Sequence, residues 1–163
     1  MLGKIQLKWL LDGLKNSTSR YKVLVSGTQF GGRKKGDSWA GKFYVGERQK
    51  LFSFILKNNI SGVIGISGDI HRSDIHKLPI GDGRYFYDLT PGSLSRKHRI
   101  PPNPIPKTMI HSYGKKTDNN MWGEIEFRPA SDKNVAVIFR SFSAKNGLVY
   151  EHKLTPNDLT LKK

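Results

Sequence analysis

The sequence predicts an α/β fold in which a βαβ unit is followed by an antiparallel β meander. Two short runs of apolar and β-branched residues, 21–26 and 61–67, flank a stretch of helical periodicity at 46–59. This order is typical of parallel strands joined by a crossover helix. Near the end of the chain, 123–154 alternates between apolar and polar residues, which predicts three sequential antiparallel strands. With 163 residues, 36% of them hydrophobic, residues 1–163 suit one domain or a large piece of one.

The first half of the chain predicts two helices and one long loop. The helix expected over 5–15 carries a single apolar stripe, made by Leu7, Leu10, Leu11 and Leu14. The helix over 46–59 places Leu51, Phe54 and Ile55 on one face. The loop 27–46 is rich in glycine and has no periodicity, and loops of this length in compact domains are usually functional or mobile.

The second half predicts strands joined by turns. Residues 84–90 alternate as a strand, and 91–106 form a proline-rich, basic excursion. The closing strands are expected at 123–128, 135–143 and 148–154. Asn146-Gly147 is a signal for a tight turn between the last two of these strands.

The composition excludes some functions and leaves two open. The chain has no cysteine, which excludes disulfides and thiolate ligands, and no apolar run approaches the roughly 20 residues of a membrane-spanning helix. The net charge is +15, from 28 Lys and Arg against 13 Asp and Glu. Such a charge favours contact with nucleic acid or another polyanion, but the lysines are spread along the chain, which equally suits a solvated surface.

A group of polar residues follows the second predicted strand directly. In SGDIHRSD, residues 67–74, Asp69 and His71 come straight after the apolar run GVIGIS. A carboxylate and an imidazole two residues apart can project to the same side and suit a divalent or trivalent metal ion. The alternative is a capping Asp69 with a surface His71. Because ligand sites in parallel sheets lie at the carboxyl ends of strands, both interpretations stay open.

Four further residues are candidates for contact with a substrate. Arg72 can hold a phosphate with two hydrogen bonds, or it can form a salt bridge with Asp74. Gln29 ends the first predicted strand on the same rim, where its amide can orient a substrate or make ordinary loop hydrogen bonds. In the glycine-rich loop, Asp37 and Trp39 can close a pocket, or Trp39 can anchor the loop in the core.

The ordered set of motifs resembles a known family. LGKIQLKWL, YKVLVSGTQF, DSW, GERQKLFSFI, GVIGISGDIH and FYDLTPGSL are similar, in this order, to the C-terminal half of the PhoD-like alkaline phosphatases. The tail MWGEIEF to VYEHKL is similar to the closing strands of that family. The resemblance implies the C-terminal half of a calcineurin-like metallophosphatase, a four-layer α/β/β/α sandwich.

The resemblance also implies a chemistry. It implies hydrolysis of phosphate monoesters or diesters at a multi-metal centre, with calcium and iron as the metals and manganese or zinc as alternatives. SGDIH then corresponds to the last metal-binding motif, so that Asp69 and His71 become metal-binding and catalytic residues. The implied substrate contacts are Arg72, Gln29, Asp37 and Trp39.

The other metal motifs of the family are expected to precede the LGKIQLKWL segment. We therefore expect this chain alone to be a poorly active enzyme that needs a complementing N-terminal fragment. Members of the family are often exported, and the localisation of this chain stays open. The alternative function is a non-catalytic basic module that binds nucleic acid or another polyanion.

Overall fold

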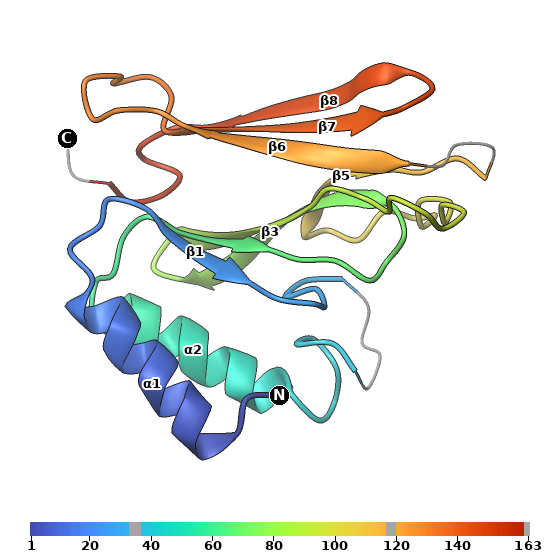
Figure 1. Cartoon of the computed structure of the whole chain (residues 1–163). Helices are drawn as coiled ribbons and strands as arrows, with labels where there is room; N and C mark the ends of the chain where they lie inside the picture. The colour runs from blue at the N-terminus through green and yellow to red at the C-terminus, as the bar shows by residue number, and fades with distance from the viewer. Residues whose placement is uncertain (33–36, 117–119, 162–163) are drawn as a thin grey trace.

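The protein folds into three layers in a computed structural model that describes residues 1–32, 37–116 and 120–161. Two helices lie on one face of a five-stranded sheet, and a three-stranded sheet packs on its other face (Figure 1). The helices are α1 (Gly3–Asn16) and α2 (Val45–Lys57). The strands are β1 (Lys22–Val25), β2 (Val63–Ile66), β3 (Ser73–Gly81), β4 (Arg84–Thr90), β5 (Met109–Tyr113), β6 (Met121–Phe127), β7 (Val137–Ser143) and β8 (Gly147–Leu154).

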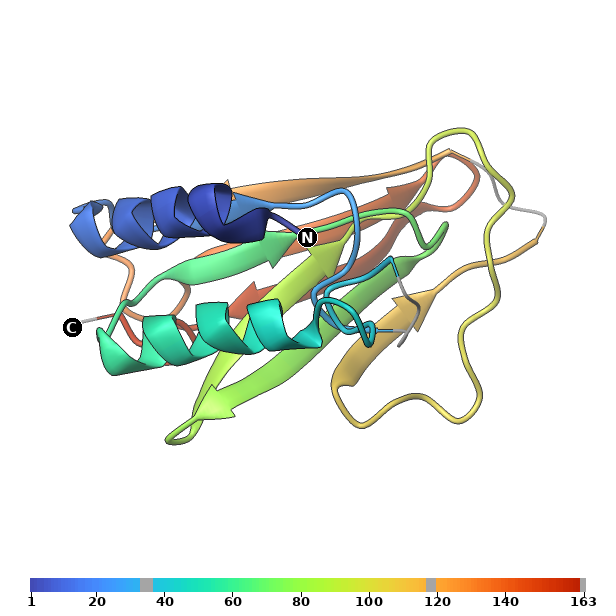
Figure 2. The same ribbon diagram turned by 90° about the horizontal axis from the view of Figure 1, so that it is seen from below.

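The five-stranded sheet contains the predicted βαβ unit. Its strand order is β1-β2-β4-β3-β5, in which β1, β2 and β4 are parallel while β3 and β5 run antiparallel to their neighbours. Helix α2 connects β1 to β2 and lies across the middle of the sheet, whereas α1 lies along the β1 edge (Figure 2). The α/β class and the crossover unit are therefore confirmed.

The three-stranded sheet is the predicted antiparallel meander, with the order β6-β7-β8. The last turn is wider than the predicted Asn146-Gly147 pair: three residues, 144–146, join the strands, and Gly147 pairs with Ser143. Gly147 has a φ of +67°, the left-handed conformation that such three-residue loops require. Within the described part of the chain no helix covers the outer face of this sheet, so three of the four implied layers are present.

Two apolar cores hold the layers together. The first lies between the helices and the five-stranded sheet, where the predicted stripe of α1 packs with Leu14 buried. Its centre is aromatic, with Phe30, Trp39, Phe52 and Phe86 among its buried residues. The second core lies between the two sheets and is rich in β-branched residues and leucine. Burial of each such large side chain stabilises the fold by about 1.5–3 kcal/mol.

Two strands, β3 and β5, were not predicted. β3 carries the buried polar residues Asp74 and His76 at positions where an ordinary strand is apolar. The hairpin from β3 to β4 does have a sequence signal, the dipeptide Asp82-Gly83. Both residues adopt positive φ in a two-residue turn.

Among the described residues, neither helix has the length and apolar character needed to cross a bilayer.

Candidate active site at the carboxyl rim of the sheet

The loops after β1 and β2 meet at one edge of the five-stranded sheet, which we call the rim. Because the two strands are parallel and in register, their carboxyl ends lie side by side, and the amide of Ser26 donates to the carbonyl of Ile66 at 2.9 Å. Gln29 follows β1 and the loop 67–72 follows β2. The rim thus carries both segments in which the sequence predicted site residues.

Asp69 and His71 occupy an unusual backbone conformation. Their φ angles are +71° and +57°, and Ile70 between them is buried. Left-handed conformations are uncommon for residues other than glycine, although Asp and His adopt them more often than most residues. Asp69 is exposed and His71 is half-buried. The amide of Arg99 donates to the carbonyl of His71 at 2.8 Å, which brings the basic excursion beside the loop.

Arg72 forms the predicted salt bridge with Asp74 underneath this loop. Its Nε and Nη2 atoms each lie 2.8 Å from a carboxylate oxygen of Asp74, and Arg72 is only 2% exposed. Ser112 on β5 donates to the same carboxylate at 2.6 Å. The pair therefore joins the loop to β3 and β5. A phosphate contact by Arg72, the other alternative, stays a prediction.

A buried hydrogen-bond network continues from this pair below the rim. Gln29 donates from Nε2 to the hydroxyl of Thr90 at 3.0 Å, and the hydroxyls of Thr90 and Ser67 lie 2.8 Å apart. Ser67 in turn donates to Asp88 at 2.6 Å, and Asp88 also accepts from the amide of Gly31 at 2.8 Å. Complete burial raises the pKa of Asp88 to about 6, and these hydrogen bonds oppose that rise.

His76 is a buried imidazole below the rim. Burial lowers its pKa to about 4, while the nearby Asp74 carboxylate opposes the shift, so the ring is neutral at pH 7. The backbone of Gly31 lies against the ring, because a Cβ atom at Gly31 would lie 2.5 Å from its Cγ. Neither ring nitrogen has a hydrogen-bond partner within the part of the chain that the structure describes. The sequence had pointed to no role for His76.

The two candidates in the glycine-rich loop differ in exposure. Trp39 is 3% exposed, stacks on Phe30 with ring centroids 5.1 Å apart, and donates from Nε1 to the hydroxyl of Ser26 at 3.0 Å. It anchors the loop in the core, as one of its two interpretations predicted. Asp37 is exposed, and it borders residues 33–36, which lie outside the described part of the chain. Gln29 is buried in the network described above.

The chemistry of Asp69 and His71 would suit one edge of a metal site. Asp69 and His71 supply a carboxylate and an imidazole from one loop, which suits iron, manganese or zinc, and a carboxylate also suits calcium. Among the described residues, however, no group of three or more His, Cys, Asp or Glu side chains can hold a metal ion. Two ligands do not complete such a site, so we derive no catalytic step from this chain alone.

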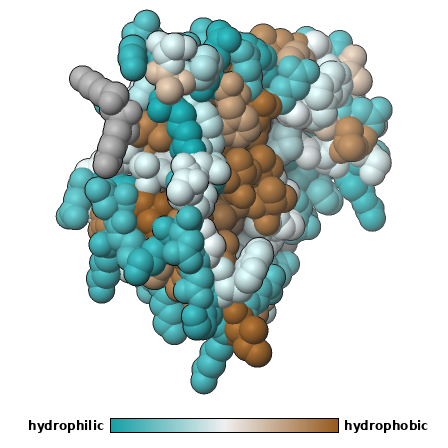
Figure 3. All heavy atoms as spheres, turned by 60° about the vertical axis from the view of Figure 1, so that its left-hand side comes forward, coloured by the Kyte–Doolittle hydropathy of each residue, from teal (hydrophilic) through white to brown (hydrophobic). Residues whose placement is uncertain are grey.

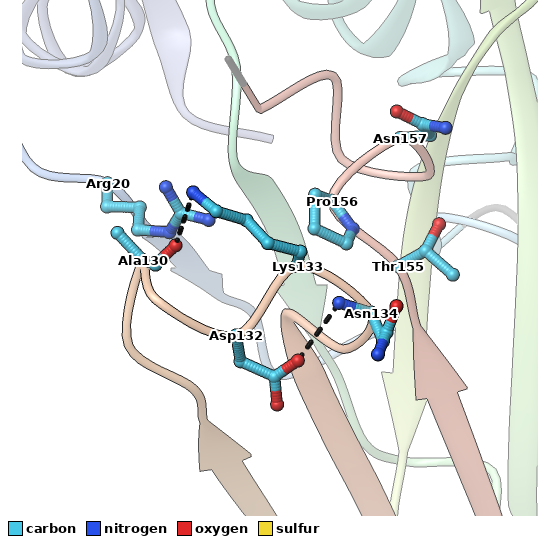
Figure 4. A pocket seen from close by; sticks show the side chains of 8 residues that line it. All are labelled: Arg20, Ala130, Asp132, Lys133, Asn134, Thr155, Pro156 and Asn157. Atoms are coloured by element: carbon cyan, nitrogen blue, oxygen red, sulfur yellow. Dashed lines mark hydrogen bonds between the residues drawn. The ribbon is translucent and has the colours of Figure 1, made fainter. Parts of the chain in front are cut away.

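A separate pocket of about 480 Å³ lies away from the rim (Figure 4). It is lined by Arg20, Ala130, Asp132, Lys133, Asn134, Thr155, Pro156 and Asn157. Arg20 precedes β1, whereas the rim follows it, so the pocket lies toward the opposite end of the sheet. Lys133 donates to the carbonyl of Ala130 at 3.2 Å and Asp132 accepts from the amide of Asn134 at 3.0 Å. These contacts are local to one loop, and we assign the pocket no function.

Comparisons with known proteins agree with this fold. The model of the PhoD-like phosphatase family matches residues 1–133. Alkaline phosphatase D of Bacillus subtilis (strain 168) is 33% identical over 82 aligned residues, which cover 45% of this chain and 14% of that protein.

Two solved structures have a similar fold. The structure of PhoD has a TM-score of 0.59 and 19% identity, and the match covers 94% of this chain and 35% of PhoD. GAP50, described as the anchor in the inner membrane complex of Plasmodium, has a TM-score of 0.52 and 15% identity, over 97% of this chain and 42% of GAP50. The chain thus spans less than half the length of each relative. Since the family model spans most of the chain, the chain belongs to the PhoD-like phosphatase family.

Proposed function

We propose that this chain is part of a phosphoric ester hydrolase and supplies one edge of its multi-metal centre, with Asp69 and His71 as metal ligands and catalytic residues. The observation that carries this proposal is the backbone of the loop 67–72. There, Asp69 and His71 lie on either side of the buried Ile70, and both have a left-handed backbone conformation. Their side chains are of the types that bind metal ions. Membership of the PhoD-like phosphatase family supports a phosphate ester as the substrate.

The residues around the loop support this role by holding its conformation. The Arg72–Asp74 pair fixes the loop from below, and the amide of Arg99 fixes the carbonyl of His71 from the side. A ligand that is held in place loses less conformational entropy on binding a metal ion. When bound, metal ions at such a centre lower the pKa of a water molecule and neutralise charge on the phosphoryl oxygens.

The four proposed substrate contacts differ in their exposure. Asp37 is exposed, while Arg72, Gln29 and Trp39 are buried below the rim. We propose that these three buried residues act on a substrate mainly by positioning the loops above them. Asp37 is then the candidate for direct contact with a substrate or a metal ion.

Metal binding by the chain provides the first test. Manganese, iron, calcium and zinc would be titrated into the purified chain and followed by calorimetry, with His71→Ala and Asp69→Ala as variants. His152→Ala is the matched control, because His152 lies on β8 in the second sheet. We expect weak binding of at least one metal by the wild-type chain and by the control. Affinity should fall at least tenfold in His71→Ala and in Asp69→Ala.

Activity provides the second test. The chain would be assayed with a chromogenic phosphomonoester and a chromogenic phosphodiester across the same four metals. We expect little or no turnover, because two ligands cannot position two metal ions. Rapid turnover that disappears in His71→Ala would show that a complete site exists in this chain and would contradict an edge-only role. Metal binding that is unchanged in both rim variants would contradict the assignment of Asp69 and His71.

A further inference from the structure

The segment that follows β4 carries positive charge without any counter-charge of its own. Residues 91–116 contain six Lys and Arg side chains and no Asp or Glu. The six are Arg96, Lys97, Arg99, Lys107, Lys115 and Lys116. All are exposed except the half-buried Arg99, and none forms an ion pair with a residue that the structure describes. Their charge is therefore available to an anionic partner.

The same segment exposes aliphatic side chains among its cations. Leu94, Ile100 and Ile105 are 69%, 58% and 54% exposed. Leu94 comes just before the exposed Arg96 and Lys97 in the sequence. The segment runs along the outside of the molecule from the end of β4, past the rim, to the start of β5 (Figure 2). We call these five residues the excursion surface.

The excursion surface has a fixed position beside the rim. His98, in the middle of the segment, is 3% exposed, and its Nε2 atom lies 3.2 Å from the carbonyl oxygen of Ser93. The next residue, Arg99, donates its amide to the carbonyl of His71 at 2.8 Å. Its own carbonyl leaves no room for a Cβ atom at Gly114, at the end of β5. The segment is thus anchored between the rim and β5, and its exposed side chains point away from a packed base.

We propose that the excursion surface binds an anionic lipid bilayer. The cations contact headgroup phosphates, and the three aliphatic side chains enter the interface between headgroups and acyl chains. Each Lys or Arg near an anionic leaflet strengthens binding roughly fivefold. Peripheral binding is stable when such a basic patch is combined with apolar insertion, and this segment supplies both signals. The proposal goes beyond the proposed function and does not depend on a metal ion.

The side-chain types in the segment favour a bilayer over nucleic acid. Proteins that bind single strands stack the bases on aromatic side chains, and the one aromatic residue in 91–116 is Tyr113. Tyr113 is half-buried, and its hydroxyl accepts a hydrogen bond from the side chain of Asn146 at 3.2 Å. Duplex readers place a helix or a β-ribbon in a groove, and 91–108 contains neither. Exposed aliphatic side chains contribute little to either mode of binding.

Vesicle binding provides the first test. The probes are vesicles of phosphatidylcholine alone and vesicles of phosphatidylcholine with about 30% phosphatidylglycerol. The purified chain would be sedimented with each in the presence of EDTA, which removes any contribution from divalent metals. We expect binding to the anionic vesicles to be about tenfold tighter or more, and to weaken at high salt because exposed charges are screened. Equal binding to both kinds of vesicle, or none, would overturn the proposal.

Charge reversal at the surface separates a local patch from the charge of the whole chain. Figure 3 shows hydrophilic side chains spread over a different face, so a matched control is needed. The variant is Arg96→Glu with Lys97→Glu, and the control is Lys4→Glu with Lys50→Glu, at exposed positions of α1 and α2. Each pair lowers the net charge from +15 to +11, because each reversal removes two positive charges.

We expect the variant at 96 and 97 to lose about tenfold or more in affinity for anionic vesicles, and the control about threefold at most. Equal losses would show that net charge alone attracts the chain to the vesicles, and would overturn the proposal.

Insertion of the aliphatic side chains can be observed directly, because the chain has no cysteine and a single introduced thiol is labelled uniquely. The labelled variants are Leu94→Cys and Ile105→Cys, and Ile5→Cys is the control, since Ile5 is 90% exposed on α1. An environment-sensitive fluorophore should shift to shorter wavelength with anionic vesicles at 94 and 105 but not at 5. No shift at 94 and 105, or an equal shift at all three, would overturn the proposal.

Nucleic acid is tested with a short DNA duplex and a short single strand. If either binds as tightly as the anionic vesicles, and binding is unchanged by Leu94→Ser and Ile105→Ser, the partner is nucleic acid and the proposal fails. The proposed function can fail independently. Vesicle binding in EDTA together with metal binding that does not depend on His71 leaves this surface standing and removes the metal role. Metal binding that depends on His71 without vesicle binding does the reverse.

Discussion

Arg72 and Asp74 form an ion pair in which Nε and Nη2 of the guanidinium each lie 2.8 Å from the carboxylate, although both side chains are almost wholly buried. Removal of one partner of a buried pair leaves an uncompensated charge. We expect Arg72→Leu to lower the free energy of unfolding by about 3–5 kcal/mol in urea titrations. The exposed pair of Lys8 and Asp12 is the control, and Lys8→Ala should cost less than about 1 kcal/mol. Equal losses in the two variants would contradict this account.

Two buried groups below the rim should give stability opposite dependences on pH. Asp88 keeps its proton in the folded state up to its pKa of about 6, whereas the unfolded group releases it near 3.8, so stability falls as pH rises through this window. The pKa of His76 is lowered from 6.5 to about 4, so stability falls as pH drops through that window. Each contribution amounts to about 3 kcal/mol.

These contributions oppose each other between pH 4 and 6 in the wild-type chain. Asp88→Asn should remove the contribution of Asp88, so that acidification from pH 6.5 to 4 destabilises this variant by about 2 kcal/mol more than it destabilises the wild type. His76→Leu should remove the second and reduce the loss of stability on acidification. Unfolding by urea at several pH values measures both slopes. Parallel pH profiles for the wild type and the two variants would show that neither group has the shifted pKa.

Substitutions of Asp69 should affect the free energy of unfolding and the affinity for metal ions differently, because the backbone of Asp69 is left-handed. Glycine adopts this conformation without steric cost, so Asp69→Gly should be at least as stable as the wild type, whereas Asp69→Val should lose about 1–2 kcal/mol. Both variants should lose metal affinity. Asp12→Gly, within α1, is the control and should be destabilised by a few tenths of a kcal/mol. If Asp69→Gly instead unfolds more easily than Asp69→Val, side-chain contacts rather than backbone strain dominate at this position.

Gly31 should tolerate no side chain. A Cβ atom there would lie 2.5 Å from Cγ of His76, which is buried and cannot move away, so Gly31→Ala should cost about 1–3 kcal/mol. A Cβ atom at Gly13 in α1 would meet nothing within 4 Å, and Gly13→Ala should stabilise the helix by about 0.5–1 kcal/mol. Opposite signs in thermal unfolding are the expected result, and a neutral Gly31→Ala would show that the loop shifts freely.

The local pattern of the sequence determined the helices, the βαβ unit and the closing meander. The leucine stripe of 5–15 and the alternation of 84–90 depend only on nearby residues, and β4 has the predicted bounds. The parallel order of β1 and β2 was enough to place Gln29 and SGDIH on one rim. These features were predictable because the periodicity of buried residues reports directly on helix or strand geometry.

The tertiary structure alone decided which polar residues are buried and what they contact. β3 was missed because Asp74 and His76 face inward, and burial of Asp74 is stable only with partners such as Arg72 and Ser112, the second of which is distant in sequence. The free edge of β1 likewise follows from the absence of a further described strand beside it, which no local pattern encodes. Hydrogen bonds and ion pairs between distant residues offset the desolvation of buried charge, so only the assembled sheet shows which residues form the site and which support it.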